Sequence, residues 1–144
     1  METKSRSLKF TDLKDMLQQT RELYGDRPAY VFKTGKSEEF KTITHKEFRD
    51  EINALGTTLI KMGLKDKRIA IVGRNRYEWV ITHLANVLGG IVSVPLDKEL
   101  QVDELESCLE RSKADVVVFD EKYIENIEEK DTETILKEAL KRLI

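Results

Sequence analysis

Residues 68–97 read R-I-A-I-V-G-R-N-R-Y-E-W-V-I-T-H-L-A-N-V-L-G-G-I-V-S-V-P-L-D. The run at 68–72 is short and almost wholly apolar, which is typical of a strand buried on both faces. A helix is expected next, because Asn75 and Glu78 have capping-box spacing and an apolar stripe follows them. Gly89-Gly90 suits the end of that helix. The stretch therefore predicts a strand, a helix and then a second strand that ends at Pro95.

The chain beyond this stretch continues the alternation of strand and helix. Residues 103–112 predict a helix with Leu105, Cys108 and Leu109 facing inward, and residues 114–119 predict a third buried strand. Right-handed crossovers between such strands give a parallel sheet with helices on both faces. The predicted fold class is therefore α/β, with three layers and a mainly parallel sheet.

The first part of the chain predicts two helices separated by a β-hairpin. A helix is expected over 12–24, capped by Thr11, and two short strands are expected around the turn at Thr34-Gly35-Lys36. A longer helix then starts at a capping box formed by Thr44 and Glu47. Gly63 suits the left-handed residue that ends this helix.

We expect one α/β domain over 1–144, because no Gly/Ser linker or internal repeat interrupts the chain. Its parts are the helix and hairpin (11–44), the parallel core (45–119) and a charged helical tail (120–144). One face of the tail is apolar. This tail either closes the sheet as a packed helix or docks on sequence outside the chain or on a second subunit. The apolar residues are Ile135, Leu136, Ala139, Leu140 and Leu143.

Composition narrows the class of protein. The 144 residues are 40% hydrophobic and 36% charged, with a formal net charge of −2. This balance supports a core but leaves no basic footprint for nucleic acid. Cys108 is the single cysteine, so no intrachain disulfide is possible. No apolar run approaches the roughly 20 residues of a membrane span, and the amino terminus has no hydrophobic signal region. We therefore expect a cytoplasmic protein without a transmembrane segment.

The sequence contains no motif that predicts a metal site or a catalytic nucleophile. His45 and His83 are the two histidines, and neither lies in a zinc or calcium motif. We expect His45 to be solvated at a helix start, and His83 to be packed with one hydrogen-bond partner. Cys108 lies on an apolar helix face, where a thiol usually behaves as a small hydrophobe. No G-x-S-x-G elbow is present.

Nucleotide motifs are incomplete. Gly73 follows a strand and precedes a helix, but the second and third glycines of a dinucleotide turn are absent. Arg74 and Arg76 at the start of that helix leave anion binding open as an alternative to a plain strand-to-helix turn. Gly56-Thr57-Thr58 looks like part of a phosphate loop, yet it falls inside the helix that starts near His45.

Two motifs carry a family resemblance. I-T-H-K-E-F at 43–48 resembles the entry motif of adenylate-forming enzymes, and L-A-N-V-L-G-G-I-V-S-V-P-L-D at 84–97 resembles their second motif. G-R-N-R-Y-E-W and P-L-D-K-E-L are more similar to bacterial long-chain fatty acid–CoA ligases than to peptide-synthetase domains. The likeness covers about Leu8 to Tyr123, and the order and spacing of the motifs make it fairly specific.

The resemblance implies a two-step ligase reaction, in which ATP and a carboxylate form an acyl-adenylate and CoA then displaces AMP. It implies ATP, magnesium and CoA as cofactors of a full-length parent, and none for this chain. The family's Ser/Thr/Gly-rich loop ending in Pro-Lys-Gly has no counterpart here, nor does its catalytic lysine. No catalytic, cofactor-binding or metal residue is therefore transferred to this chain.

We expect an amino-terminal scaffold part of a long-chain acyl-CoA ligase, inactive in isolation. The expected partners are the remainder of the ligase, or a second copy through an exposed sheet edge or the tail helix. One alternative is a stand-alone interaction module that pairs with a separate catalytic protein. Another is a small nucleotide-binding protein that uses Arg74 and Arg76. The acyl chain length is not readable from the sequence, and neither is the origin of the chain as a cloned piece or a natural short product.

Overall fold

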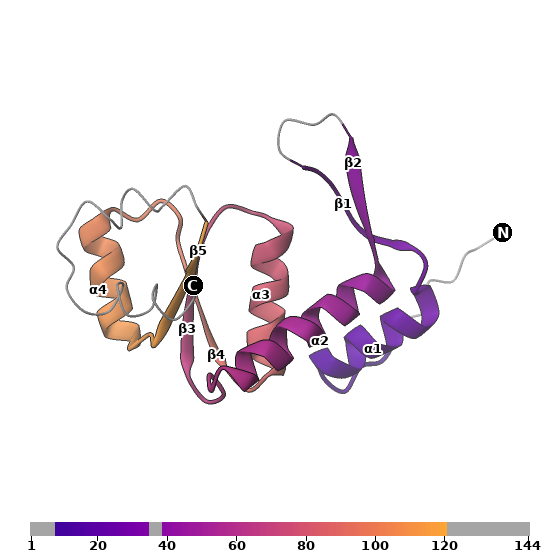
Figure 1. Cartoon of the computed structure of the whole chain (residues 1–144), viewed down its shortest axis with the longest axis horizontal. Coiled ribbons are helices and arrows are strands. Elements are labelled where there is room, and N and C mark those ends of the chain that lie inside the picture. Colours follow the sequence, from indigo (N-terminus) through magenta and orange to yellow (C-terminus); the bar gives the residue numbers. More distant parts are fainter. Residues whose placement is uncertain (1–7, 35–38, 121–144) are drawn as a thin grey trace. The chain divides into compact units, whose positions relative to one another are not determined.

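A computed structural model describes residues 8–34 and 39–120. The chain divides into two compact units, Met1–Asp50 and Glu51–Ile144. The described elements alternate between helix and strand along the second unit (Figure 1). The single domain predicted over 1–144 stays a prediction. The tail helix falls on 121–144 and lies outside the described residues.

The first unit contains helix α1 (Leu13–Tyr24) and the antiparallel strands β1 (Pro28–Lys33) and β2 (Phe40–Thr44). The predicted hairpin strands are therefore confirmed. The predicted cap of α1 is wrong by one residue, because the Asp12 carboxylate accepts from the Asp15 amide at 2.7 Å. Thr11 instead donates its amide and hydroxyl hydrogens to the Asp15 carboxylate.

Helix α2 (His45–Lys61) starts at the predicted capping box. The Thr44 amide donates to Glu47 Oε2 at 2.8 Å, and the Glu47 amide donates to Thr44 Oγ1 at 3.2 Å. These hydrogen bonds lower the pKa of Glu47, because they stabilise its charged form. Gly63 follows the helix at φ +80°, in the left-handed region that favours glycine. Both ends of this helix were correctly predicted.

The second unit is built on a parallel sheet in the order β4-β3-β5. Its strands are β3 (Arg68–Val72), β4 (Val92–Leu96) and β5 (Val116–Phe119). Helix α3 (Tyr77–Leu88) connects β3 to β4, and helix α4 (Val102–Ser112) connects β4 to β5. Figure 1 shows α3 and α4 on opposite sides of the sheet, as right-handed crossovers require. The predicted three-layer α/β class is confirmed.

Strand β4 continues one residue past Pro95, where it was predicted to end. The Val92 amide donates to Lys67 O, so alternate residues of β4 turn their backbone groups toward β3. Pro95 is three residues further on, and its missing amide hydrogen therefore falls on the side away from β3. Among the described strands β4 is an outer strand, which is where a sheet accommodates proline.

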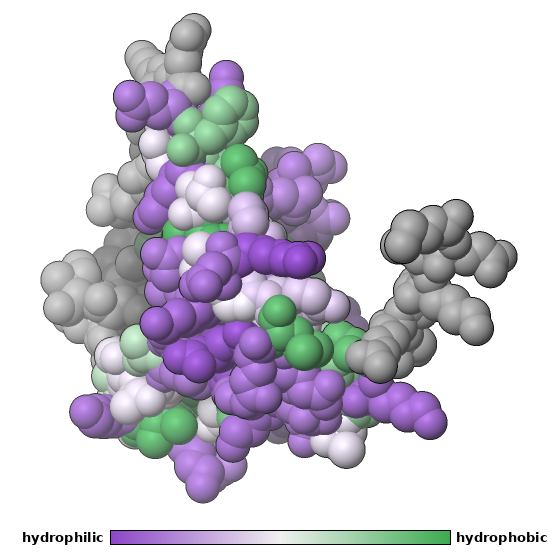
Figure 2. All heavy atoms as spheres, turned by 90° about the vertical axis from the view of Figure 1, so that its right-hand side faces the viewer, coloured by the Kyte–Doolittle hydropathy of each residue, from purple (hydrophilic) through white to green (hydrophobic). Residues whose placement is uncertain are grey.

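The sheet is buried on both faces. One core consists of side chains that meet α4, and the alternate residues Ile69, Ile71 and Val116 are buried as well. Hydrophilic side chains cover most of the face shown in Figure 2, with hydrophobic ones in separate spots. The α4-side core is formed by Ala70, Val72, Leu105, Leu109, Ala114 and Val117.

Candidate functional site

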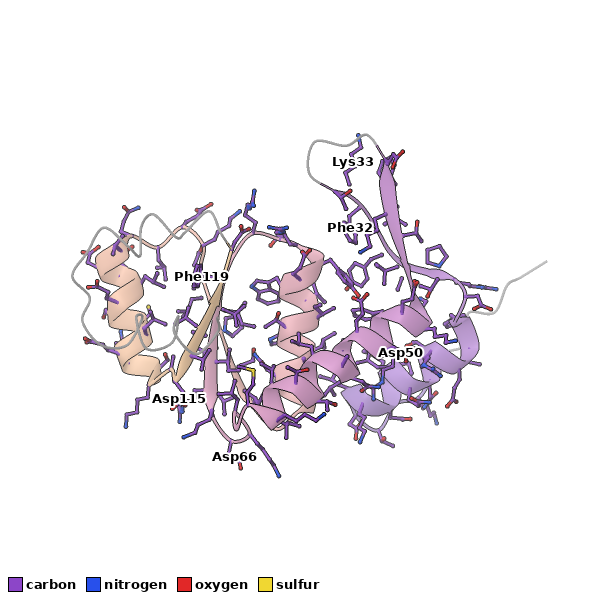
Figure 3. The ribbon with its side chains drawn as sticks, in the orientation of Figure 1. Phe32, Lys33, Asp50, Asp66, Asp115 and Phe119 are labelled. Carbon is purple, nitrogen blue, oxygen red and sulfur yellow. The ribbon has the colours of Figure 1, made fainter. Side chains whose placement is uncertain are left out.

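A pocket of about 190 Å³ lies at the carboxyl ends of β3 and β5. The chain moves from β3 to β4 in one direction and then crosses back to β5 on the other side of β3. Crevices outside the carboxyl ends of parallel strands at such a reversal are the usual ligand sites of α/β sheets. Figure 3 labels Phe119 at this end of β5 and Asp115 before the opposite end. The lining residues are Ile71, Val72, Gly73, Arg74, Arg76, Glu78, Trp79, Thr82, Val118, Phe119 and Asp120.

An ion cluster dominates the polar side of the pocket. Arg74 Nε lies 2.7 Å from Asp120 Oδ2, and Arg74 Nη2 lies 3.0 Å from Asp120 Oδ1. Arg76 Nη1 lies 3.4 Å from the same Oδ1, while its Nε lies 3.3 Å from Glu78 Oε2. The Asp120 side chain is 3% exposed, whereas both arginines remain nearly half exposed. The cluster ties the turn after β3 to the end of β5.

The charges of this cluster cancel. Among residues 8–34 and 39–120, two guanidinium groups face two carboxylates, so the ion pairs of this cluster balance in charge. The two-point contact between Arg74 and Asp120 is the strongest geometry for such a pair. These contacts fit a plain strand-to-helix turn, and anion binding at Arg74 and Arg76 stays an alternative prediction.

The N-cap of helix α3 lies one residue later than predicted. Its N-cap is Arg76, and no side chain caps the first turn. Glu78 is thus the second helical residue rather than the third, and its carboxylate pairs with Arg76 instead of closing a box with Asn75. The capping role predicted for Asn75 is wrong for this reason. The predicted end of the helix at Gly89-Gly90 is confirmed, with Gly90 at φ +71°.

His83 has the packed environment predicted for it. Its ring lies against the Trp79 ring with centroids 5.3 Å apart, and Nδ1 lies 2.9 Å from Ser93 Oγ. The half-buried His45 is the first residue of α2, and its ring centroid lies 6.0 Å from that of Tyr24. Its predicted solvation is therefore only partial. Among the described residues, neither histidine belongs to a group of His, Cys, Asp and Glu side chains that could hold a metal ion.

The remaining candidates are structural. Cys108 is a half-buried free thiol on α4, next to the buried Leu109. Gly56 lies inside α2, where a β-carbon would approach Ala85 O to 3.5 Å. The resemblance of Gly56-Thr57-Thr58 to a phosphate loop is therefore accidental, as predicted. In residues 8–34 and 39–120 no cluster of His, Cys, Asp or Glu is suited to a metal ion, and no helix is long and apolar enough to cross a membrane.

Asp120 is the site residue that sequence reasoning missed. We assigned it to the charged tail, although it directly follows a predicted buried strand. Its amide donates to Val72 O, which places its side chain beside the turn that follows β3. A carboxylate directly after a parallel strand lies where α/β folds gather polar side chains, and that signal was available.

A model of the AMP-binding enzyme family matches residues 17–143. The chain belongs to this family. A mitochondrial medium-chain acyl-CoA ligase ACSF2 of Danio rerio is 31% identical over 120 residues, which are 83% of this chain and 19% of the ligase. Long-chain-fatty-acid–CoA ligase 5 of Rattus norvegicus is 33% identical over 100 residues, covering 64% of this chain and 15% of the ligase.

Solved structures show the same fold for this AMP-binding family member. A putative long-chain-fatty-acid CoA ligase of Rhodopseudomonas palustris has a TM-score of 0.72 at 24% identity, covering 84% of this chain and 30% of the other. The N-terminal subdomain of Klebsiella oxytoca NpsA, in complex with anthranilyl-AMSN, has a TM-score of 0.67 at 22% identity, with 78% and 28% covered. The chain thus spans about a fifth or less of these curated ligases and under a third of the structures.

Proposed function

We propose that this chain is a scaffold portion of an AMP-forming acyl-CoA ligase and has no ligase activity by itself. The observation that carries the proposal is the family match over 17–143, combined with a coverage of 19% of the Danio rerio ligase. Four fifths of such an enzyme is therefore supplied by other sequence. The part matched here contributes a parallel sheet and its covering helices.

The chemistry of the described residues supports the proposal that the isolated chain has no ligase activity. Adenylation requires cations and preorganised donors that offset charge developing on phosphates. The two arginines nearest the pocket face Asp120 and Glu78 instead. Arginines that are paired with carboxylates hold the end of β5 against the turn after β3. They offer little net positive charge to stabilise a phosphate.

The finer assignment is to the long-chain type. The motifs G-R-N-R-Y-E-W and P-L-D-K-E-L support it, as does the rat relative named as a long-chain-fatty-acid–CoA ligase. The Danio rerio relative is named as a medium-chain ligase, so chain length is the weaker part of the proposal. For the full-length parent we propose ATP, magnesium and CoA as reactants and cofactors, and a cytoplasmic location.

The proposed partner is the remainder of the ligase, with self-association of the isolated chain through its sheet edge as a second possibility. The alternative of an independent interaction module rested on the apolar stripe of the tail. That stripe lies outside the described residues, and no observation on the described part favours the module.

Two experiments test the proposal. The purified chain is incubated with ATP, magnesium, CoA and palmitate, and AMP release is measured beside an intact long-chain ligase. No turnover is expected, and turnover by the chain alone would overturn its inactivity. Sequencing the gene past the codon for Ile144 tests the scaffold assignment, since a continuing frame that encodes the phosphate loop is expected. An immediate stop codon would count against it.

A further inference from the structure

Ser93 of β4 lies between two polar side chains of α3. Its hydroxyl oxygen is 2.9 Å from His83 Nδ1 and accepts from Asn86 Nδ2 at 3.4 Å. Asn86 is completely buried, and its Oδ1 has no hydrogen-bond partner among the described residues. A buried polar atom without a partner is costly, so the arrangement of this trio calls for a reason.

The donors and acceptors of the trio can be assigned from their chemistry. A serine hydroxyl has one hydrogen to donate and accepts through its oxygen. The Asn86 amide donates to that oxygen, which leaves the hydroxyl hydrogen available to His83 Nδ1. In the arrangement that we assign, Nδ1 accepts this hydrogen, and the hydrogen of the neutral ring is on Nε2. Hydrogen bonds thus run from Asn86 through Ser93 to His83.

Protonation of His83 would reverse this direction. Nδ1 then carries a hydrogen and donates to Ser93, whose own hydrogen must find another acceptor. A half-turn of the Asn86 amide exchanges Oδ1 and Nδ2, which places Oδ1 about 3.4 Å from Ser93 Oγ. Each arrangement contains two hydrogen bonds and leaves one Asn86 atom without a partner. The reversal therefore loses no hydrogen bond.

We propose that Asn86, Ser93 and His83 form a proton-responsive relay between α3 and β4, whose hydrogen bonds reverse direction when His83 is protonated. The relay makes the contact between these elements tolerant of both ring states. This role is independent of the ligase assignment, because it depends only on contacts within the second unit.

Most charged groups on the elements around α3 whose contacts are described here bond to groups other than His83. Strand β4 has no ionisable residue, and Arg68 of β3 donates to Ser112 O. On α2, Glu51 accepts from Tyr77, and Lys61 lies in the last turn of that helix. On α3 itself, Glu78 pairs with Arg76. Ser93 is the residue whose polar atom lies within hydrogen-bond distance of the His83 ring among the described contacts.

The chain supplies its own reporter for this change. Trp79 is the only tryptophan, and its ring stacks on His83 with an interplanar angle of 24°. A protonated imidazole in contact with an indole quenches its fluorescence, whereas a neutral ring does so weakly. A fall in Trp79 emission on acidification therefore reports protonation of His83, and the side-chain amide signals of Asn86 report the response of the relay.

The test is a pH titration of the full chain by fluorescence and by ¹⁵N NMR. We expect the Trp79 emission and the Asn86 side-chain amide signals to change with one common midpoint, and the His83 ring to pass from the Nε2–H form to the doubly protonated form. In Ser93→Ala the emission still falls while the Asn86 signals stay constant. His83→Gln removes both transitions and assigns them to His83 rather than His45.

Several results would overturn the relay. Asn86 signals that stay constant while His83 titrates in the native chain would show that the amide does not respond. A His83 ring that begins as the Nδ1–H form, or that does not titrate before acid unfolding, would also contradict it. If His83→Gln fails to fold, the ring signals of His83 in the native chain identify the titrating group directly.

Discussion

Arg74 and Asp120 form a two-point ion pair that joins the turn after β3 to the end of β5. The two contacts are 2.7 and 3.0 Å long, and the carboxylate is almost completely removed from water. The residues are 46 positions apart in the sequence. The pair closes the carboxyl end of the sheet at the place where a ligand site is most often found in α/β proteins.

Asp120→Asn should destabilise the chain and expose a latent anion site. Removing the buried charge leaves Arg74 and Arg76 without their shared partner, and we expect a loss of about 1–3 kcal/mol, reduced because the arginines are half exposed. The variant should also gain melting temperature in millimolar phosphate, since a ligand of the folded state stabilises it. Urea denaturation and thermal melting measure the two effects.

The exposed Asp26→Asn variant is the matched control, because it changes the net charge equally. It should leave both readouts close to those of the native chain. Equal phosphate stabilisation of the native chain and Asp120→Asn would show that the arginines are not held by Asp120.

Gly56→Ala and Gly63→Ala should change stability in opposite directions. Gly56 is inside α2, and a β-carbon there would make an ordinary 3.5 Å contact with Ala85 O, so alanine should stabilise by about 0.5–1 kcal/mol. Gly63 has φ +80°, where alanine should cost about 1–2 kcal/mol. Chemical denaturation of both variants checks the pair. Destabilisation by Gly56→Ala would contradict this prediction and show that α2 and α3 pack too closely at Gly56 to admit a β-carbon.

Tyr77→Phe should weaken the contact between α2 and α3 within the second unit. The buried Tyr77 hydroxyl donates to Glu51 Oε2 at 2.6 Å, and hydrogen bonds to charged groups contribute about 1.5–3 kcal/mol. We expect a loss near the lower value, because Glu51 is partly exposed. A double-mutant cycle with Glu51→Gln measures the coupling, and additive effects of the two changes would contradict it.

The start of α2 should make stability depend on pH through Glu47. Hydrogen bonds from the amide and hydroxyl of Thr44 lower the pKa of Glu47 below its ordinary value. The folded pKa is thus below the unfolded value, so this stabilisation is fully present above the unfolded pKa and is lost as pH falls through the folded pKa. Glu47→Gln should have a lower melting temperature than the native chain at neutral pH, and the difference between the two melting temperatures should become smaller on acidification.

Thr44→Ser is the conservative control for this effect, since serine offers the same amide and hydroxyl donors. Its melting temperature should follow the native pH profile. A gap between the native chain and Glu47→Gln that stays constant from neutral to strongly acid pH would exclude the capping box as its source.

Short-range patterns explain why much of the fold was predictable. The capping box at Thr44 and Glu47, the left-handed Gly63 and the apolar run of β3 each depend on residues close together in the chain. The cap of α3 was mispredicted because Asn75 and Glu78 have the right spacing but Glu78 is drawn to Arg76. The partner of the Glu78 carboxylate was therefore set by the neighbouring charge of Arg76 and not by the spacing from Asn75.

The candidate site was less predictable. Its clustered charges come from the turn after β3, the start of α3 and the end of β5, and nothing in the sequence near Arg74 indicates that Asp120 will pair with it. The relay at Ser93 has the same origin, since His83 and Asn86 reach it only after α3 folds back on β4. Distances between such groups are set by strand order and crossover, which no local pattern encodes.

By itself the sequence determined the α/β class and most helix ends, because hydrophobic period, capping residues and glycine conformation act within a few residues. The family was indicated separately, by the resemblance of the motifs at 43–48 and 84–97. Only the tertiary structure shows that Arg74 and Arg76 both contact the carboxylate of Asp120. The parallel sheet brings Asp120 beside β3, and a buried carboxylate at hydrogen-bond distance holds a guanidinium more strongly than water does. The stretch 68–97 thus identifies the family, while its position against β5 determines what its charged residues do.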